Sequence, residues 1–278
     1  MPLPSDFQFS QGSLQDFVEC GRRFQLRYLL QIAWPAVPTE PYLESEEHLR
    51  LGALFHLMAQ QHTLGVDEAR LTAMAQEEPL ATWWQSYLQH RPALEGVLFS
   101  EAVLATPFGQ LGQRRLLAKM DLVAVAGGRA TIYDWKTSRH RPPRAWLAER
   151  LQTRVYPYLM VQAGAELNDG KAVTPEQVEM VYWFTGFPDR PERFVYSTAQ
   201  YAEDGALLAG LLEQAVALST SDAPFPLTPD ESKCRFCVYR SLCNRGVVAG
   251  DVNELDFDDP EPAVEFDLDF EQVAEVEY

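Results

Sequence analysis

Three stretches near the start of the chain space their apolar residues as helices do. Residues 13–31 predict a helix that Ser13 caps, with Asp16 at the capping-box position. The apolar side chains that define this helix are Leu14, Phe17, Phe24 and Tyr28. Residues 49–62 predict a second helix, and residues 80–90 predict a third.

The pattern changes from helix to strand after residue 95. Runs rich in Val, Leu, Ile and aromatic residues predict strands, and Gly127-Gly128 supply a two-residue hairpin turn. The predicted strands are residues 96–106, 114–126, 129–137, 180–186 and 193–198. The predicted later helices are residues 143–163 and 199–217. This order predicts an α/β or α+β core with helical flanks.

The hairpin turn fixes which residues of its two strands face one another. If Ala126 pairs with Arg129, Asp121 lies directly opposite Asp134, with Cβ atoms about 4.5 to 5.5 Å apart on one face. Because strand side chains alternate, Lys136 projects from the same face. The hairpin therefore presents two carboxylates and one ammonium to a small volume.

Trp135, between Asp134 and Lys136, is expected to point the other way, towards Met120 and into the core.

Like charges that face each other on a hairpin destabilise it unless something neutralises them. A hard divalent cation does so, since Mg²⁺ prefers carboxylate oxygens and keeps waters that can become nucleophiles. Lys136 can orient such a water, help to deprotonate it, or offset charge on a phosphate. The residues alone also allow an ordinary surface hairpin, in which Lys119 and Lys136 screen the aspartates.

The net charge of -17 at first argues against a nucleic-acid partner, which usually leaves a basic footprint. Residues 251–278, however, hold twelve of the forty Asp and Glu residues and no Lys or Arg. Residues 1–250 then carry 28 acids and 23 bases, which is compatible with a groove for DNA. We expect one main domain over residues 1–250 and an acidic tail over residues 251–278.

The chain has no apolar run that approaches the roughly 18 residues of a membrane span, and no signal peptide at its start. We therefore expect a cytoplasmic protein without a membrane partner. There is also no phosphate-binding G-x-x-x-x-G-K-[ST] motif, so any ATP-driven helicase must be a separate protein.

Four cysteines in a reducing compartment favour a metal site over disulfides. Cys234, Cys237 and Cys243 form a local triplet, whereas Cys20 lies on the first predicted helix. Four thiolates suit tetrahedral Zn²⁺ or an iron–sulfur cluster, but zinc modules usually bring their ligands in two local pairs. Zinc and four reduced, unliganded thiols remain the alternatives.

Together these segments resemble the RecB-like families of the PD-(D/E)XK nuclease superfamily, which include CRISPR-associated RecB-like exonucleases. The resemblance spans residues 9–245. The motifs that carry it, in chain order, are FSQGSLQDFVECGRRF, GALFH, an acidic strand at Glu101, MDLV, YDWKTS, QTRVY and CRFCVYRSLC. It implies a restriction-endonuclease-like core, with a central mixed sheet flanked by helices and its ends tied by a [4Fe-4S] cluster.

The resemblance also implies roles for individual residues. The ligands of a catalytic Mg²⁺ or Mn²⁺ would be His56, Asp121, Asp134 and the carbonyl of Trp135. Lys136 would be the catalytic lysine, and Gln152 and Tyr156 match the Q-x-x-x-Y motif of this branch. Glu101 is a weaker candidate for tuning the metal or its water. The Asp at position 134 is a departure from the many relatives that carry Glu there.

Each of these residues has an ordinary alternative when it is taken alone. His56 on an apolar helix would be a core histidine, and Glu101 would face solvent on an edge strand. Gln152 and Tyr156, four residues apart, would be surface and packing residues of one helix face.

Arg139, Arg141 and Arg144 follow the predicted catalytic strand and are candidates for contacts with DNA phosphates. Arg22, Arg23, Arg114 and Arg115 would extend this positive path, although scattered solubilising charges are the alternative. The acidic tail is either disordered and solvating, or it binds the DNA groove of its own chain or a partner protein.

The sequence thus predicts a metal-dependent deoxyribonuclease, expected to be an exonuclease on single-stranded DNA or DNA ends. Its setting would be DNA repair and recombination, or CRISPR spacer acquisition, with a helicase or a CRISPR integrase as partner. The alternative is a non-catalytic, cluster-stabilised DNA-binding or assembly subunit of a larger complex.

Overall fold

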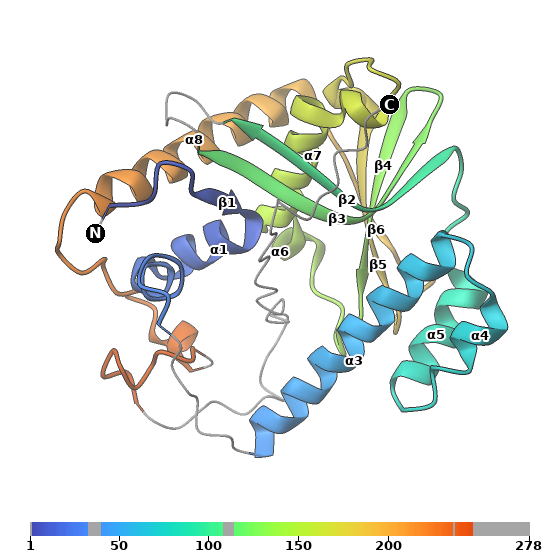
Figure 1. Cartoon of the computed structure of the whole chain (residues 1–278), viewed down its shortest axis with the longest axis horizontal. Coiled ribbons are helices and arrows are strands. Elements are labelled where there is room, and N and C mark those ends of the chain that lie inside the picture. Colours follow the sequence, from blue (N-terminus) through green and yellow to red (C-terminus); the bar gives the residue numbers. More distant parts are fainter. Residues whose placement is uncertain (1, 33–39, 108–113, 236, 247–278) are drawn as a thin grey trace.

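A computed structural model describes residues 2–32, 40–107, 114–235 and 237–246 of the chain (Figure 1). The acidic tail lies outside the described residues, so the structure does not test the prediction that the tail binds a groove or a partner. Within the described ranges, no helix is long and apolar enough to cross a membrane.

A six-stranded mixed sheet forms the centre of the fold, with helices on both faces (Figure 1). Its strands are β1 (Gln8–Ser10), β2 (Val97–Pro107), β3 (Arg115–Ala126), β4 (Arg129–Lys136), β5 (Val178–Phe184) and β6 (Glu192–Val195). The order is β1-β3-β4-β5-β6, and β2 pairs with the other edge of β3. The β1–β3 and β4–β5 pairs are parallel and the rest are antiparallel. The predicted α/β fold class is thereby confirmed.

The helices enclose two separate cores, one on each face of the sheet. The α-helices are α1 (Gln11–Glu19), α2 (Gly21–Phe24), α3 (Glu40–Thr63), α4 (Glu68–Thr72), α5 (Leu80–His90), α6 (Arg144–Glu149), α7 (Leu151–Ala163) and α8 (Thr198–Ser219). A π-helical turn, Gln25–Leu29, extends α2, and a short 3-10 turn, Glu231–Cys234, lies near the end of the described chain.

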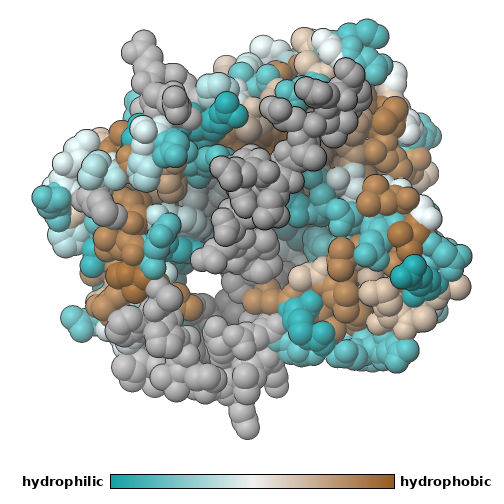
Figure 2. Space-filling view, in the orientation of Figure 1, coloured by the Kyte–Doolittle hydropathy of each residue, from teal (hydrophilic) through white to brown (hydrophobic). Residues whose placement is uncertain are grey.

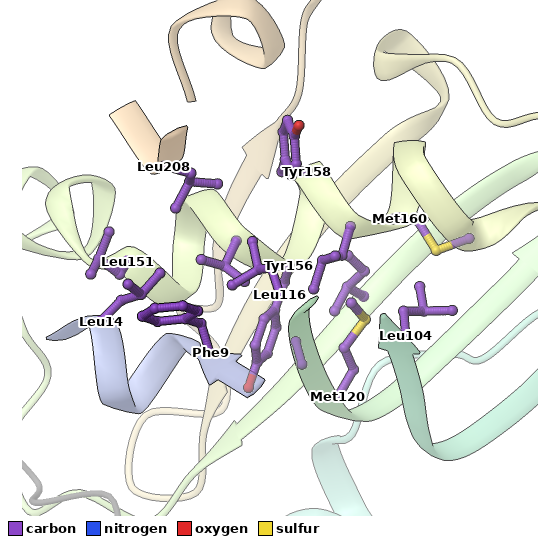
Figure 3. Close-up of a cluster of buried hydrophobic side chains, with 14 of the residues drawn as sticks. Phe9, Leu14, Leu104, Leu116, Met120, Leu151, Tyr156, Tyr158, Met160 and Leu208 are labelled. Atoms are coloured by element: carbon purple, nitrogen blue, oxygen red, sulfur yellow. The ribbon is translucent and has the colours of Figure 1, made fainter. Parts of the chain in front are cut away.

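Side chains of α1, α7 and α8 fill the core on one face, where Leu14, Leu151 and Leu208 are buried (Figure 3). Side chains of α3 and α5 fill the other core, an aromatic cluster that includes Trp84, Trp135 and Trp183.

Strand alternation explains how one sheet supplies both cores. On β4, Ala130 and Ile132 belong to the α7 core, whereas Tyr133 and Trp135 belong to the aromatic cluster. The observed pairing of Ala126 with Arg129 and of Leu122 with Tyr133 confirms the register that the Gly127-Gly128 turn predicts.

The prediction that Trp135 points towards Met120 is wrong. Trp135 packs in the aromatic cluster, whereas Met120 lies in the core on the opposite face. Regular alternation would put Met120 and Leu122 on one face, yet Leu122 also belongs to the aromatic cluster. The regular alternation of β3 side chains between the two faces is therefore interrupted at Asp121. At the same level of the neighbouring strand β2, Glu101 adopts a left-handed conformation with φ of 55°.

The single helix predicted over residues 13–31 is broken at Cys20, whose backbone is extended. Ser10, rather than Ser13, caps α1, and the two serines bond reciprocally. A tertiary contact accompanies the break, since the amide of Arg22 in the first turn of α2 donates to the carbonyl of Pro226 at 3.0 Å.

The helix predicted over residues 143–163 is also two helices, which meet at Arg150 with ψ of 139°. The second helix begins earlier than predicted, at Glu40, and the third matches its predicted bounds. Strand β1 and helix α4 are too short to produce a periodic pattern and were not predicted.

Apolar residues also gather at the surface in two places, over the α1 end of the molecule and over α3 to α5 (Figure 2). Val18 of α1 is 52% exposed and Leu57 of α3 is 43% exposed. Single exposed apolar side chains are ordinary on a folded surface.

A substitution at Gly96 tests the close backbone approach between the start of β2 and the end of β3. An added Cβ would lie 2.1 Å from the carbonyl oxygen of Val125, and φ is +85°. We expect Gly96→Ala to lower the free energy of unfolding by at least about 3 kcal/mol, measured by denaturant titration.

Gly65→Ala is the matched control, since Gly65 has φ of +87° and no neighbouring atom within 4 Å of an added Cβ. It should cost only about 1–2 kcal/mol, from the left-handed backbone alone. Equal losses in the two variants would contradict the close approach.

Candidate functional site

One edge of β3 is left open where Asp121 lies. Strand β2 occupies the other edge from Arg115 to Val125. On the open side β1 pairs with residues 115–117 and β4 pairs with residues 122–126, so on this edge no strand in the described sheet pairs with residues 118–121. The Asp121 side chain enters this gap, and its Oδ2 accepts the amide N–H of Trp135 at 2.8 Å. The Asp121 carboxylate thus accepts a backbone amide that would otherwise need a partner from a neighbouring strand.

Asp134 is the most buried charged group of the site, with 3% of its surface exposed. The strand ladder ends at the Leu122–Tyr133 pair, immediately before Asp121 and Asp134. The Asp134 Oδ2 lies 2.9 Å from the Lys136 Nζ. Burial of a carboxylate is strongly unfavourable without a charged partner, and the Lys136 ammonium supplies one.

Gln152 of α7 ties this ion pair to a helix. Its Nε2 donates to the Asp134 Oδ1 at 2.6 Å and to the Tyr156 hydroxyl at 3.1 Å. Its Oε1 accepts from the Lys136 Nζ at 3.1 Å. Because a glutamine amide offers both donors and an acceptor, it can hold an acid and a base together. The two residues of Q-x-x-x-Y thus form one network with D-x-K, and both are buried.

His56 reaches the site from α3. Its Nδ1 lies 3.2 Å from the Asp121 Oδ1. Helix α3 comes close to the end of β4 one turn earlier, where a Cβ on Gly52 would lie 3.1 Å from the Thr137 Oγ1. Glycine at position 52 therefore permits the approach that brings His56 to Asp121.

The pKa values of His56 and Asp121 move apart. Burial lowers the pKa of His56, but the charge of Asp121 and the hydrogen bond to it outweigh burial, so the pKa is raised. Burial raises the pKa of Asp121, yet the His56 charge and hydrogen bond, with the Trp135 amide, bring it below its usual value. The pair therefore favours an imidazolium beside a carboxylate.

Glu101 lies on β2 at the point where the β2–β3 pairing skips one residue, opposite Asp121. Its carboxylate forms an ion pair with Lys119. Burial lowers the pKa of that lysine. The structure thus brings Glu101 to the neighbourhood of Asp121 with its charge already compensated.

Two of the three candidate DNA-binding arginines contact a buried glutamate. Arg141 forms an ion pair with Glu192 of β6, and Arg144 donates to the same carboxylate at 2.8 Å. The Arg144 guanidinium also stacks 4.2 Å from the centre of the Phe194 ring. These contacts fasten the loop after β4 to β6, whereas Arg139 is exposed.

All four cysteines are free thiols, and Cys20 lies close enough to the other three to influence their pKa values. Burial raises the pKa values of Cys234, Cys237 and Cys243, and the charge of Cys20 raises all three further. The Gln25 Oε1 accepts the Phe225 amide at 2.9 Å, which joins the same two chain segments.

Among the described residues, no three His, Cys, Asp or Glu side chains lie together in a way that would hold a metal ion as they stand. All four oxygens of Asp121 and Asp134 already face protein donors, namely His56, the Trp135 amide, Lys136 and Gln152.

Sequence reasoning missed Tyr182 of β5, which pairs with Asp134 across the parallel ladder. Its ring centre lies 5.6 Å from the Lys136 Nζ, and its hydroxyl is 2.7 Å from the Thr153 Oγ1. Only the β4–β5 register could have identified it, and a crossover connection does not fix that register as a two-residue turn does.

The charge balance at His56 can be tested by titration of its ring in the chelator-treated protein. Removal of Asp121 by Asp121→Asn leaves burial as the largest influence, so the His56 pKa should fall from above 6.5 to below it. The Lys136→Met variant should raise the pKa instead, because it removes a nearby positive charge. An NMR titration that moves the same way in both variants would contradict this geometry.

Comparison with known proteins gives a family for the whole described core. Among curated proteins there is no match. Similar solved structures include SSO0001, with 14% identity and a TM-score of 0.46 over 87% of this chain and 87% of that chain. A presumed exonuclease from Eubacterium rectale has 9% identity and a TM-score of 0.46, over 79% of this chain and 83% of that one. The family model of the PD-(D/E)XK nuclease superfamily matches residues 8–244, which include every site residue described above, and the chain belongs to that superfamily.

Proposed function

We propose that this protein is a Mg²⁺- or Mn²⁺-dependent nuclease that hydrolyses DNA phosphodiester bonds at the site around Asp121 and Asp134. The observation that carries the proposal is the Asp134–Lys136–Gln152 network beside the Asp121–His56 pair. Two acids, a lysine and an imidazole from separate elements gather at an open strand edge. An ordinary surface hairpin has no need of this arrangement.

The side chains present fit a hard divalent cation. The proposed ligands are the carboxylates of Asp121 and Asp134, the imidazole of His56 and the carbonyl of Trp135. Carboxylate and carbonyl oxygens are the ligands that Mg²⁺ and Mn²⁺ prefer, and an imidazole is compatible with them. When bound, such a cation supplies Lewis-acid stabilisation of charge on phosphate oxygens and lowers the pKa of a water.

The protein's own groups have separate tasks in this proposal. Lys136 orients the attacking water or offsets charge on the scissile phosphate, as a lysine beside a phosphate can. Gln152 and Tyr156 hold Lys136 and Asp134 in place. Glu101 tunes the metal or its water from the neighbouring strand in this proposal, with its carboxylate paired to Lys119.

Metal entry requires a rearrangement of protons and side chains. His56 and Lys136 lie against the carboxylate oxygens that would bind the cation. Both must release these oxygens, and His56 must also lose its proton, because only neutral imidazole is a ligand. The two cationic side chains therefore keep the carboxylates compensated until a metal replaces them.

Within the superfamily we assign the chain to the RecB-like branch, on the order of its motifs and on Gln152 and Tyr156. The substrate in this assignment is single-stranded DNA or DNA ends, cut as an exonuclease, and Arg139, Arg141 and Arg144 contact its phosphates. A helicase partner would mean DNA repair or recombination, whereas a CRISPR integrase partner would mean spacer acquisition. The genes next to this one discriminate between the two.

The variants Asp134→Ala and Lys136→Ala test the proposed site. Each should lower the rate of metal-dependent cleavage of end-labelled DNA by at least about a hundredfold, the effect of losing one pre-organised group. Circular dichroism should show that both variants fold. Arg129→Ala, an exposed change on the same hairpin, should cleave normally. Cleavage at the wild-type rate in both test variants would rule out this site.

We also propose that Cys20, Cys234, Cys237 and Cys243 bind a [4Fe-4S] cluster. Support comes from their free thiols and their effects on one another's pKa values. A single tetrahedral zinc ion needs its four sulfurs within about 3.8 Å of one another, given Zn–S bonds of about 2.3 Å. A [4Fe-4S] cluster is larger and accepts thiolates that lie farther apart than this.

The metal content of anaerobically purified protein decides between the cluster and zinc. We expect about four iron atoms per chain and visible absorption from the cluster. Cys20→Ser should lose most of the iron and lower the thermal midpoint, because the cluster joins segments more than 200 residues apart. One zinc and no iron in the wild-type protein would contradict the cluster.

A further inference from the structure

Helix α7 begins without a side-chain cap of its own. Arg150 occupies the N-cap position, and its side chain accepts no hydrogen bond from the first turn. The first backbone amides of any helix have no partner within the helix, so they need one from elsewhere. Here the partner comes from α1, since the Leu151 amide donates to the Gln15 Oε1 at 3.4 Å.

Glu19 orients Gln15 for this contact. The Gln15 Nε2 donates to the Glu19 Oε1 at 2.8 Å, so the amide oxygen is the end left to face α7. The same carboxylate lies 3.5 Å from the Arg150 Nη1 and forms an ion pair with Arg23. Glu19 is largely shielded, with 12% of its side chain exposed.

Apolar packing places the two helices side by side at this point. Leu14 of α1 lies next to Leu151 of α7 within the larger core (Figure 3). Arg23 fixes the last turn of α1 from the other side, because its Nε lies 2.8 Å from the Asp16 Oδ1 while its Nη2 contacts Glu19. We call the contacts of Gln15 and Glu19 with the start of α7 the clamp. The helix that carries the clamp, α1, is thus itself held in place by Arg23.

The residue after Leu151 is Gln152, which holds Asp134 and Lys136. A displacement of the first turn of α7 would move this amide away from both groups. Misplacement of about 1 Å at a reacting centre can cost about a hundredfold in rate. The exact start of α7 is thus a requirement of the site and not only of the fold.

We propose that Gln15 and Glu19 are positioning residues for the nuclease reaction, which supply from α1 the cap that α7 lacks and so hold Gln152 against Asp134 and Lys136. This inference rests on the proposed function. Neither residue touches DNA or metal in the proposal. Their effect passes through the first turn of α7.

The variant Gln15→Met keeps the side-chain length and removes the acceptor. We expect faster hydrogen exchange at the amides of residues 151–153 and a kcat for DNA cleavage at least about tenfold lower, with KM changed less than about twofold. Val18→Ala is the matched control, because Val18 lies on the exposed side of the same helix. It should change neither quantity.

A rescue separates capping from general stability. In the double variant Gln15→Met/Arg150→Ser, a serine at the N-cap can accept from the amide of Gln152 or Thr153, so α7 carries its own cap. In the double variant, the hydrogen-exchange rates of residues 151–153 and the kcat should return to within about threefold of the values for the Arg150→Ser single variant. That single variant is the reference because it lacks the same Arg150 contacts as the double variant.

Three outcomes would overturn the clamp: unchanged exchange in Gln15→Met, faster exchange with unchanged kcat, or no recovery in the double variant. A wild-type protein that cleaves no DNA with Mg²⁺ or Mn²⁺ would contradict the proposed function alone. In that case the exchange rates of the single and double variants still decide whether α1 caps α7.

Discussion

A buried carboxylate and its ammonium partner lie at the centre of this protein. Asp134 is almost completely enclosed, and Lys136 and Gln152 both contact its oxygens and offset the cost of its burial. Removal of either partner would leave an uncompensated charge or polar group inside the fold. The elements that supply these partners, β4 and α7, are therefore fixed relative to one another by electrostatics as well as by apolar packing.

The sheet leaves a gap along one edge of β3, next to the buried Asp134 carboxylate. Strands β1 and β4 share one edge of β3, and on that edge they leave residues 118–121 without a strand partner. The Asp121 side chain fills that interval, and Glu101 has a left-handed backbone at the same level of β2. Strain of this kind persists only where surrounding structure enforces it, and it often accompanies functional sites. An irregular stretch of sheet thus coincides with the gathered charges.

Much of this arrangement could be predicted because it rests on local rules. The two-residue turn at Gly127-Gly128 fixed the β3–β4 register, and alternation then put Lys136 on the face of Asp134. The spacing of Gln152 and Tyr156 placed both on one face of a helix, where they bond to each other. Each of these inferences spans only a few residues.

Long-range contacts account for what was not predicted. The interruption at Cys20 coincides with a contact between Arg22 and Pro226, and Met120 lies on the face away from Trp135 because the alternation of β3 is irregular at Asp121. Tyr182 reaches Lys136 through a crossover whose register no turn specifies. The contact from Gln15 to Leu151 joins residues 136 positions apart and has no local signature.

If Asp121 and Asp134 together hold one divalent cation, calorimetric titration of Mn²⁺ into the purified protein should detect it, with Asp121→Asn and Asp134→Asn for comparison. We expect saturable Mn²⁺ binding to the wild-type protein that either substitution weakens at least about tenfold, since each removes a charged ligand. Equal Mn²⁺ affinity in all three proteins would contradict it.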